Sequence, residues 1–149
     1  MVKHSLKSSG GPHGKRIIQP RGIAEAVGLF ARAILIDRHL YIAGTSALSR
    51  VSGGYYDRFA PEGIEEQTRL TLENIKKCVE AANGTIDDIY KLVIMLRNTE
   101  DYENMNIIRA EYFTKSQTIS TCFHAGVMRA DILVEIEDVA YIANPTTSD

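Results

Sequence analysis

The sequence predicts an α+β domain in which one β-sheet carries two helices on one of its faces. Apolar runs of strand length lie in the first third of the chain, in its middle and near its end. Between them, two segments repeat their apolar residues at helical spacing. The expected order is a hairpin, a helix, a strand, a second helix and two further strands. A single sheet with both helices on one side is the economical packing for that order.

The first predicted element is a β-hairpin. Its strands are residues 33–36 and 40–43, both rich in Ile and Leu, with Asp37-Arg38-His39 as a short turn between them. Residues 51–54 (Val-Ser-Gly-Gly) mark a loop, and a less ordered stretch is expected as far as Pro61.

The first predicted helix covers residues 64–82. Its apolar side chains recur at helical spacing, its glutamates come early and its lysines come later, as the helix dipole favours. Asn83-Gly84 is the expected stop, because Gly tolerates the left-handed conformation that follows a C-cap.

Residues 91–96 form a nearly continuous apolar run, which predicts a strand buried on both faces with the preceding helix as a crossover. A second helix is expected from near Thr99, whose hydroxyl can cap it, to about Phe113. Its inward side chains are Met105, Ile108 and Tyr112. Residues 119–125 and 132–142 are the closing strands.

Length and charge limit the class of protein. The chain has 149 residues, enough for one domain with its own core, and 17 basic against 19 acidic side chains give a net charge of −2. That balance argues against a disordered chain, a fibrous repeat or an electrostatically driven nucleic-acid binder. We expect a flexible basic tail at 1–16, one domain at 17–143 and a C-terminal tail at 144–149.

Cysteine and hydropathy patterns indicate an ordinary intracellular protein. Cys78 and Cys122 lie far apart and no histidines cluster near them, so neither a metal site nor a disulfide framework is expected. No apolar run is long enough to span a bilayer, and the N-terminus has no secretory signal. We therefore expect a cytoplasmic protein that binds neither membrane nor nucleic acid.

The sheet face without helices bears on assembly. The last strand offers apolar side chains beside acidic ones on both of its faces. An apolar face this large argues for oligomerisation through the sheet, with ligand sites in the clefts between subunits.

Two positions can carry chemistry. Alternation along residues 119–125 puts Ser120, Cys122 and His124 in one row. That row is either a reactive set or simply a small core cysteine with a surface histidine. In the last strand, Glu135 can act as a general base if it faces a cleft, and is otherwise a solvated side chain.

Five stretches of the chain form a recognisable set. The most specific are Glu66-Gln67-Thr68-Arg69 with Leu72-Glu73-Asn74-Ile75, and the run from Leu133 to Ala140 that contains Val-Glu-Ile-Glu. The others are Gly28 to Ala33, Leu40 to Thr45, and Asn106 to Phe113. In their order and spacing, these motifs together resemble the Rid (YjgF-type) family over roughly residues 17–143.

The resemblance implies a chorismate-mutase-like mixed sheet and a homotrimer with clefts for a small-molecule substrate between subunits. Active members are enamine/imine deaminases, which add water to 2-imino or 2-amino-unsaturated acids and give a keto acid and ammonia, without a cofactor. Glu135 matches the family's catalytic glutamate, and Cys122 matches a cysteine common at the site. The turn containing Gly44 and Thr45 also resembles that of 2-aminomuconate deaminases.

Some family features are missing. The arginine that clamps the substrate carboxylate falls at Ser120, or at Ile119 if the alignment shifts by one, and neither can form that bidentate contact. Phe30 stands where the family has a tyrosine, and Ala43 where it has a serine.

Other polar residues can compensate. We expect Glu135, His124 and Cys122 to carry the chemistry. The substrate is expected to contact residues that line the cleft, namely Ser120, Phe30, Gly44, Thr45, Arg32 and Arg129. The leading hypothesis is a deaminase retuned to a less anionic substrate. The alternatives are a hydratase or tautomerase of the same fold and a small-ligand-binding regulatory protein.

Overall fold

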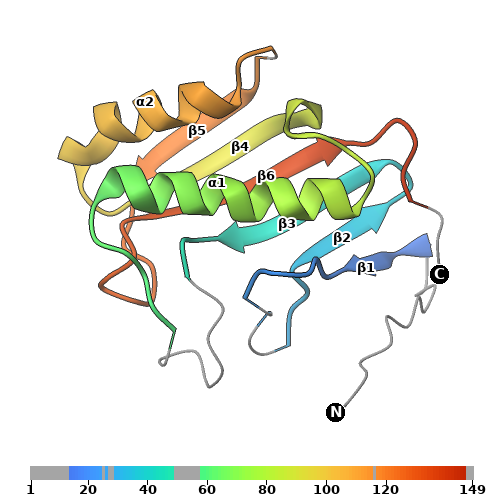
Figure 1. Ribbon diagram of the computed structural model, residues 1–149, viewed down its shortest axis with the longest axis horizontal. Coiled ribbons are helices and arrows are strands. Elements are labelled where there is room, and N and C mark those ends of the chain that lie inside the picture. The colour runs from blue at the N-terminus through green and yellow to red at the C-terminus, as the bar shows by residue number, and fades with distance from the viewer. Residues whose placement is uncertain (1–13, 25, 27–28, 49–57, 116, 147–149) are drawn as a thin grey trace.

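The computed structural model describes residues 14–24, 26, 29–48, 58–115 and 117–146. These residues form a single mixed sheet with two helices lying side by side across one of its faces, as Figure 1 shows. The sequence predicts this α+β architecture, and the prediction is confirmed. The other face of the sheet carries no helix in the described part of the chain, and we call it the open face.

The sheet has six strands in the order β1-β2-β3-β6-β4-β5. Neighbouring strands are antiparallel except β4 and β5, which are parallel. Their bounds are β1 Arg16–Ile18, β2 Ala33–Ile36, β3 His39–Thr45, β4 Ile89–Leu96, β5 Ile119–His124 and β6 Val134–Tyr141. The predicted hairpin is β2–β3.

Helix α1, residues Ile64–Ala81, connects β3 to β4 across the sheet, as predicted. Its apolar stripe, including Leu72, Ile75 and Val79, is fully buried against the strands. The helix stop differs in detail from the prediction. Asn83, not Gly84, takes the left-handed conformation, with φ 69°. Gly84 is instead required for packing, because a Cβ there would lie 2.4 Å from Cδ1 of Ile142.

Helix α2, residues Tyr102–Tyr112, connects β4 to β5 and lies beside α1. Its core side chains include Met105 and Ile108, as predicted. A 3₁₀ turn at Thr99–Asp101 precedes it. The predicted cap is wrong: Thr99 lies within that turn, and Asp101 occupies the N-cap position without a side-chain hydrogen bond.

The prediction that the strand at residues 91–96 is buried on both faces is wrong for strand β4. Leu92, Ile94 and Leu96 are buried under the helices, but Val93 and Met95, on the open face, are only partly covered. The strand is therefore not buried on both faces within one chain. A continuous apolar run predicts that both faces of a strand are buried, but it does not say whether the second face is buried by the same chain or by another.

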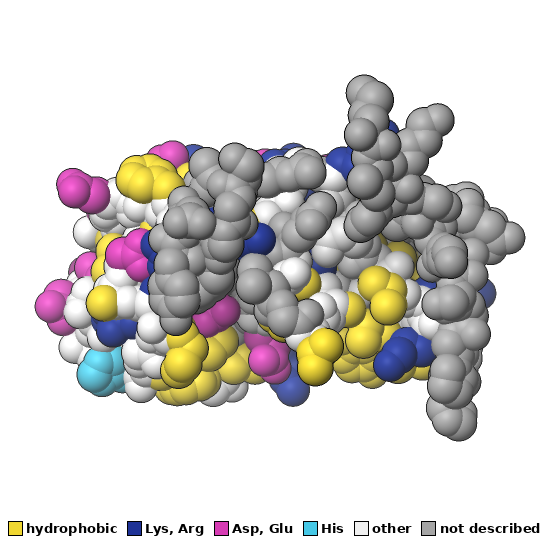
Figure 2. Space-filling view, turned by 90° about the horizontal axis from the view of Figure 1, so that it is seen from below, with side chains coloured by type: hydrophobic (Ala, Val, Ile, Leu, Met, Phe, Trp, Pro, Cys, Tyr) yellow, Lys and Arg dark blue, Asp and Glu magenta, His cyan; other side chains and the backbone are white. Residues whose placement is uncertain are grey.

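Exposed apolar side chains mark the open face. In Figure 2 hydrophobic side chains gather along the lower margin, the side turned away from the helices. The strand register assigns to the open face the exposed side chains of Ile17, Ile36, Tyr41, Tyr141, Ile119 and Phe123. Surfaces of this kind are typical of protein interfaces.

Contacts of the fold extend to residues near both ends of the described chain. Strand β1 begins at Arg16, and the amide of Thr146 donates a hydrogen bond of 3.1 Å to the carbonyl of Ala82. Most of the basic tail and the loop at 51–54 lie outside the described residues. Neither α1 nor α2 combines the length and the apolar character that crossing a membrane requires.

Candidate functional site

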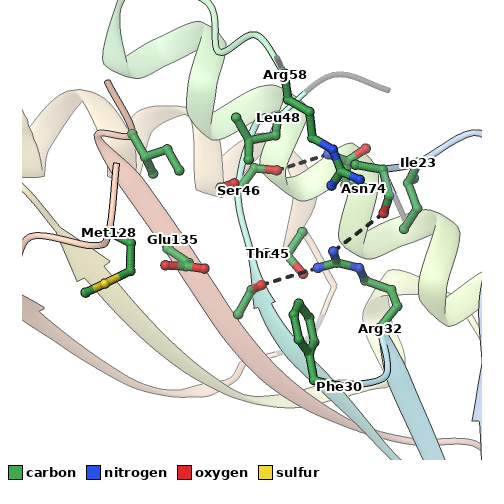
Figure 3. Close-up of a pocket in the computed structure, with 13 residues that line it drawn as sticks. Ile23, Phe30, Arg32, Thr45, Ser46, Leu48, Arg58, Asn74, Met128 and Glu135 are labelled. Atoms are coloured by element: carbon green, nitrogen blue, oxygen red, sulfur yellow. Dashed lines mark hydrogen bonds between the residues drawn. The ribbon is translucent and has the colours of Figure 1, made fainter. Parts of the chain in front are cut away.

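A cavity of about 460 Å³ lies at the end of β3 and the start of β6 (Figure 3). Its walls come from loops, strands and helix α1, which are distant in the sequence. The lining residues are Ile23, Ala24, Phe30, Arg32, Gly44, Thr45, Ser46, Leu48, Arg58, Asn74, Met128, Ile132 and Glu135. Five residues expected to act at the site, Phe30, Arg32, Gly44, Thr45 and Glu135, therefore share this cavity.

Glu135 is the acidic group of the cavity. It is half-buried near the start of β6, and its neighbour across the strands is Gly44 of β3. Burial raises the pKa of the Glu135 carboxyl, and the nearby charge of Glu137 raises it further, while Arg32 lowers it. A carboxyl group with this balance can exchange protons closer to neutral pH than an ordinary glutamate can.

Arg32 is a basic group of the same cavity, and its side chain is only 9% exposed. Its guanidinium donates hydrogen bonds to the carbonyls of Gly44, at 3.3 Å, and Ala24, at 3.5 Å (Figure 3). It also lies 5.9 Å from the ring centroid of Phe30. Burial lowers the pKa of Arg32, yet at neutral pH the group stays charged. The buried cation therefore faces Glu135 from the cavity wall.

Side chains that the sequence analysis did not single out complete the wall. Asn74 of α1 donates a hydrogen bond of 3.0 Å to the carbonyl of Ser46, which ties the helix to the loop after β3. Arg58 and Met128 also line the cavity. Asn74 lies within the recognised helix motif, but only the packing of α1 over β3 shows where it points. Arg58 and Met128 lie in loops, which have no periodicity to read.

The loop between β5 and β6 is held by Arg97, which follows β4. The Arg97 guanidinium donates to the carbonyls of Ile132, Val127 and Arg129, at 2.9, 3.0 and 2.7 Å. This arginine fixes the loop that carries Met128 to the rim of the cavity. Met128 is 91% exposed there.

Ser120, Cys122 and His124 lie in one row, as the alternation predicts. Their partners in β4 are Leu92, Ile94 and Leu96, which places the row on the face that the helices cover. Glu135 pairs with Met95 and belongs to the open face. Within one chain the Ser120 row and Glu135 therefore point to opposite sides of the sheet.

A second hollow, of about 160 Å³, lies beside this row. It is lined by Leu96, Thr99, Tyr102, Cys122, Phe123 and His124. Burial raises the pKa of the Cys122 thiol, while the charge of Arg109 opposes that rise. A protonated thiol suits the wall of a binding site better than the role of nucleophile.

Two further arginines differ in what they contact. Arg129 is engaged with its neighbour Asp131 through a 2.9 Å hydrogen bond from Nε and an ion pair from Nη2. Arg109, which the sequence analysis did not single out, reaches from α2 to β5 and donates a 2.9 Å hydrogen bond from Nη1 to Oγ of Ser120. No sequence signal marks this contact, because it depends on how α2 lies over the strand. Within the described residues no cluster of three or more His, Cys, Asp or Glu side chains is placed to hold a metal ion.

Comparison with known proteins shows the family to which this fold belongs. The model of the family described as endoribonuclease L-PSP matches residues 22–142. A RutC family protein of Pyrococcus horikoshii is 32% identical over 127 residues, which are 85% of this chain and 98% of that protein.

Solved structures agree with the family match. A candidate endoribonuclease L-PSP of Entamoeba histolytica has a TM-score of 0.77 and 29% identity, over 86% of this chain and 99% of the other. The Rid-family protein YyfA of Yersinia pestis has a TM-score of 0.77 and 28% identity, over the same shares. The chain belongs to the endoribonuclease L-PSP family, the Rid (YjgF-type) family that its motifs resemble.

Proposed function

We propose that the protein is an enzyme that hydrolyses a small enamine or imine and releases ammonia. The observation that carries the proposal is the position of Glu135, a half-buried carboxyl group with a raised pKa that shares a cavity with the buried cation of Arg32. Family membership supports the same reaction class. An imine carbon is itself electrophilic, so the protein has only to hold the substrate, orient water and move protons.

The proposed reaction has two stages. Ionised Glu135 accepts a proton from water as the water oxygen bonds to the C=N carbon, and the imine nitrogen takes up a second proton from solvent, which gives a neutral carbinolamine. The C–N bond then breaks and the nitrogen leaves as ammonia, while the carbinolamine hydroxyl releases its proton to solvent and becomes the carbonyl group. The proton that Glu135 accepted in the first stage is the one it returns to the leaving nitrogen, so the residue is regenerated.

The proposed site is shared between subunits. Glu135 and the row of Ser120, Cys122 and His124 lie on opposite faces of the sheet, so a cleft that uses both must take them from two chains. The exposed apolar side chains of the open face support such an assembly. We expect the homotrimer that the family resemblance implies, which light scattering coupled to size-exclusion chromatography would measure directly. A monomer at micromolar concentration would contradict the shared site.

The enzymatic test follows the decay of 2-iminopropionate or 2-iminobutyrate generated in situ. The protein should accelerate decay, and Glu135→Gln should reduce that acceleration by about 10²-fold or more, the usual contribution of a general base. Glu80→Gln, which removes an exposed carboxylate from α1, is the matched control and should leave the rate unchanged. Acceleration that survives Glu135→Gln would refute the assignment of the base.

A second function is favoured by the loss of family groups at Ser120 and Phe30. A catalytically altered member would act as a hydratase or tautomerase, or bind a small ligand for regulation. A panel of enamines, enols and muconate-like compounds separates these cases. Turnover of an enol without ammonia release supports the hydratase or tautomerase, and saturable binding without turnover of any compound supports the regulatory protein.

A further inference from the structure

The cavity that holds Glu135 is larger than a small imine needs, and much of its wall is apolar. Its volume of about 460 Å³ lies in the range of sites that take drug-sized ligands. Figure 3 shows Glu135 and Ile23 on opposite sides of this space. In the same view Leu48 lies above the space and Phe30 below it. A substrate whose reacting carbon lies at Glu135 therefore has apolar side chains around the rest of its body.

Three polar side chains of the wall direct their hydrogen bonds at the protein backbone. Arg32, Thr45 and Asn74 each donate to main-chain carbonyl groups, at distances of 2.8 to 3.5 Å. A ligand that competed for these donors would exchange one hydrogen bond for another, so it would gain little. These side chains hold the wall together, and they leave apolar contact as the main source of affinity for the body of a substrate.

Leu48 and Ile132 belong to a small apolar cluster that is separate from the core under the helices. Together with Ala60 they are at most 8% exposed, and Val127 packs against them. The members of the cluster come from the segments after β3, before α1 and before β6. Because these segments pack against one another, the chain itself builds the apolar wall, and a ligand does not have to order it.

Arg97 fixes the loop between β5 and β6, which supplies Ile132 and Met128 to the cavity. Its guanidinium donates to three carbonyls of this loop at 2.7 to 3.0 Å, and its amide donates to the carbonyl of Leu133 at 2.9 Å. Gly126 gives the guanidinium room, since a Cβ there would lie 3.1 Å from Nη1. Lysine has no planar fork and cannot reproduce this set of contacts. Arg97 is therefore placed to act on a substrate through the loop.

We propose that this cavity binds a bulky apolar group of the substrate, such as an aromatic ring, and that Arg97 is the positioning residue for the wall around it. This inference rests on the proposed function and narrows its substrate. The imine or enamine carbon that reacts at Glu135 carries an apolar substituent large enough to reach Leu48 and Ile132. A substrate without such a group gains nothing from the apolar wall.

The kinetic test compares the imines of phenylpyruvate and pyruvate, each generated in situ from the corresponding amino acid. The two differ only in the phenyl ring, so the effects of the carboxylate and the C=N bond cancel. The value of kcat/KM should be about 10- to 100-fold higher for the imine that carries the ring, because the cavity buries it. Equal values, or a preference for the imine of pyruvate, would overturn the inference.

Variants of the wall show where the ring lies. Leu48→Ala should reduce the preference for the phenylpyruvate imine by about 3- to 10-fold, since it removes part of the apolar wall. If the full preference survives, the ring does not lie in the cavity and the inference is wrong. The matched control is Ile107→Ala, which removes an exposed aliphatic side chain from α2 and should leave the preference unchanged.

Arg97→Lys tests the positioning role. It should raise KM for the phenylpyruvate imine by about 3- to 10-fold more than KM for the pyruvate imine, with similar kcat values for the two. An equal loss of kcat on both substrates would show a merely structural role. Arg69→Lys, on the exposed side of α1, is the control and should change neither constant. Thermal melting checks the folding of each variant, and Leu48→Ala tests the cavity independently of Arg97.

Binding of the keto acids, which needs no turnover, separates this inference from the proposed function. Calorimetric titration of the full-length protein should give a Kd at least 10-fold lower for phenylpyruvate than for pyruvate, and Leu48→Ala should narrow the difference. That result without any imine turnover would uphold the apolar subsite and refute the deaminase. Turnover of both imines that depends on Glu135, with equal Kd values for the two keto acids, would uphold the deaminase and overturn the apolar subsite.

Discussion

Gly44 and Glu135 lie face to face on neighbouring strands, so closely that a side chain on Gly44 would have to displace the Glu135 carboxylate. A Cβ at this position would lie 2.9 Å from Oε1 of Glu135 and 3.2 Å from its Cδ. The backbone of Gly44 has no positive φ, so the glycine is needed for space and not for conformation. The carboxylate of Glu135 therefore lies against the backbone of Gly44 in the wall of the cavity.

Replacing Gly44 by alanine should displace the Glu135 carboxylate while the strand stays intact. We expect the rate of imine decay to fall by about 10-fold or more, because small misplacements of a catalytic group are costly. The sharpest measurement is a double-mutant cycle with Glu135→Gln. If Gly44→Ala acts through Glu135, the double variant should be no slower than Glu135→Gln alone. Additive losses would show that the methyl group blocks the substrate instead.

Burial of Glu135, and to a smaller extent the charge of Glu137, should raise the lower pH limit of activity. The proposed base works when ionised, so kcat/KM should fall as pH drops through the pKa of Glu135, which lies above its ordinary 4.5. Because Glu137 helps to raise that pKa, Glu137→Gln should move the acid limb of the pH profile to lower pH. Comparing the variant with wild type on one substrate cancels the substrate's own titration. If Glu80→Gln shifts the acid limb of the pH profile as far as Glu137→Gln does, the charge of Glu137 does not act locally on Glu135.

Much of the fold could be predicted because its periodicity is local. The stripe of Leu72, Ile75 and Val79 is buried at its spacing along α1, and the alternation in β5 correctly grouped Ser120 with Cys122. These patterns depend only on which side of an element meets the core.

The site was harder to predict, because its contacts join distant segments. The sequence suggested one polar set, yet the register of β4 with β5 and β6 puts Cys122 and Glu135 on opposite faces. The contact between Arg109 and Ser120 requires the placement of α2. Asp138 is buried in the core, and its alternation with Val134 and Ile136 predicts that position. The residue type argues against it, because aspartate is rarely buried.

Gln67 should be a main support of the segment that leads into β6. Its buried amide donates to the carbonyls of Pro61, at 2.8 Å, and Asp131, at 2.7 Å, and accepts from the amide of Leu133. Gln67→Leu leaves three backbone groups without partners, so the free energy of unfolding should fall by about 2–4 kcal/mol.

Chemical denaturation of Gln67→Leu measures this loss. Exposed Gln117, replaced in the same way, is the control and should change stability by less than about 0.5 kcal/mol. Gln67→Glu keeps an acceptor for the Leu133 amide but loses the donors, so it too should destabilise. A Gln67→Leu variant as stable as wild type would show that water replaces these bonds.

Asp138 is the least expected residue of the core. It is 1% exposed, on the helix-covered face of β6, and neither carboxyl oxygen has a hydrogen-bond partner among the described residues. Burial raises the pKa of Asp138 well above its ordinary value, and the charge of Glu137 adds to the rise; the Cys78 thiol is the other titratable group that interacts with it. Since the folded state holds this proton more tightly than the unfolded state, stability should fall as pH rises above about 4.

Asp138→Ala should therefore raise the free energy of unfolding at pH 7 by about 1 kcal/mol, because it removes a buried polar group without a partner. It should also flatten the decline of stability from pH 4 upward, measured by urea unfolding at a series of pH values. Asp138→Asn separates the two effects: it cannot ionise, so the decline should flatten, but its amide stays unpaired and the gain should be smaller. A loss of stability in both variants would mean that the carboxyl group has a bonding partner in solution.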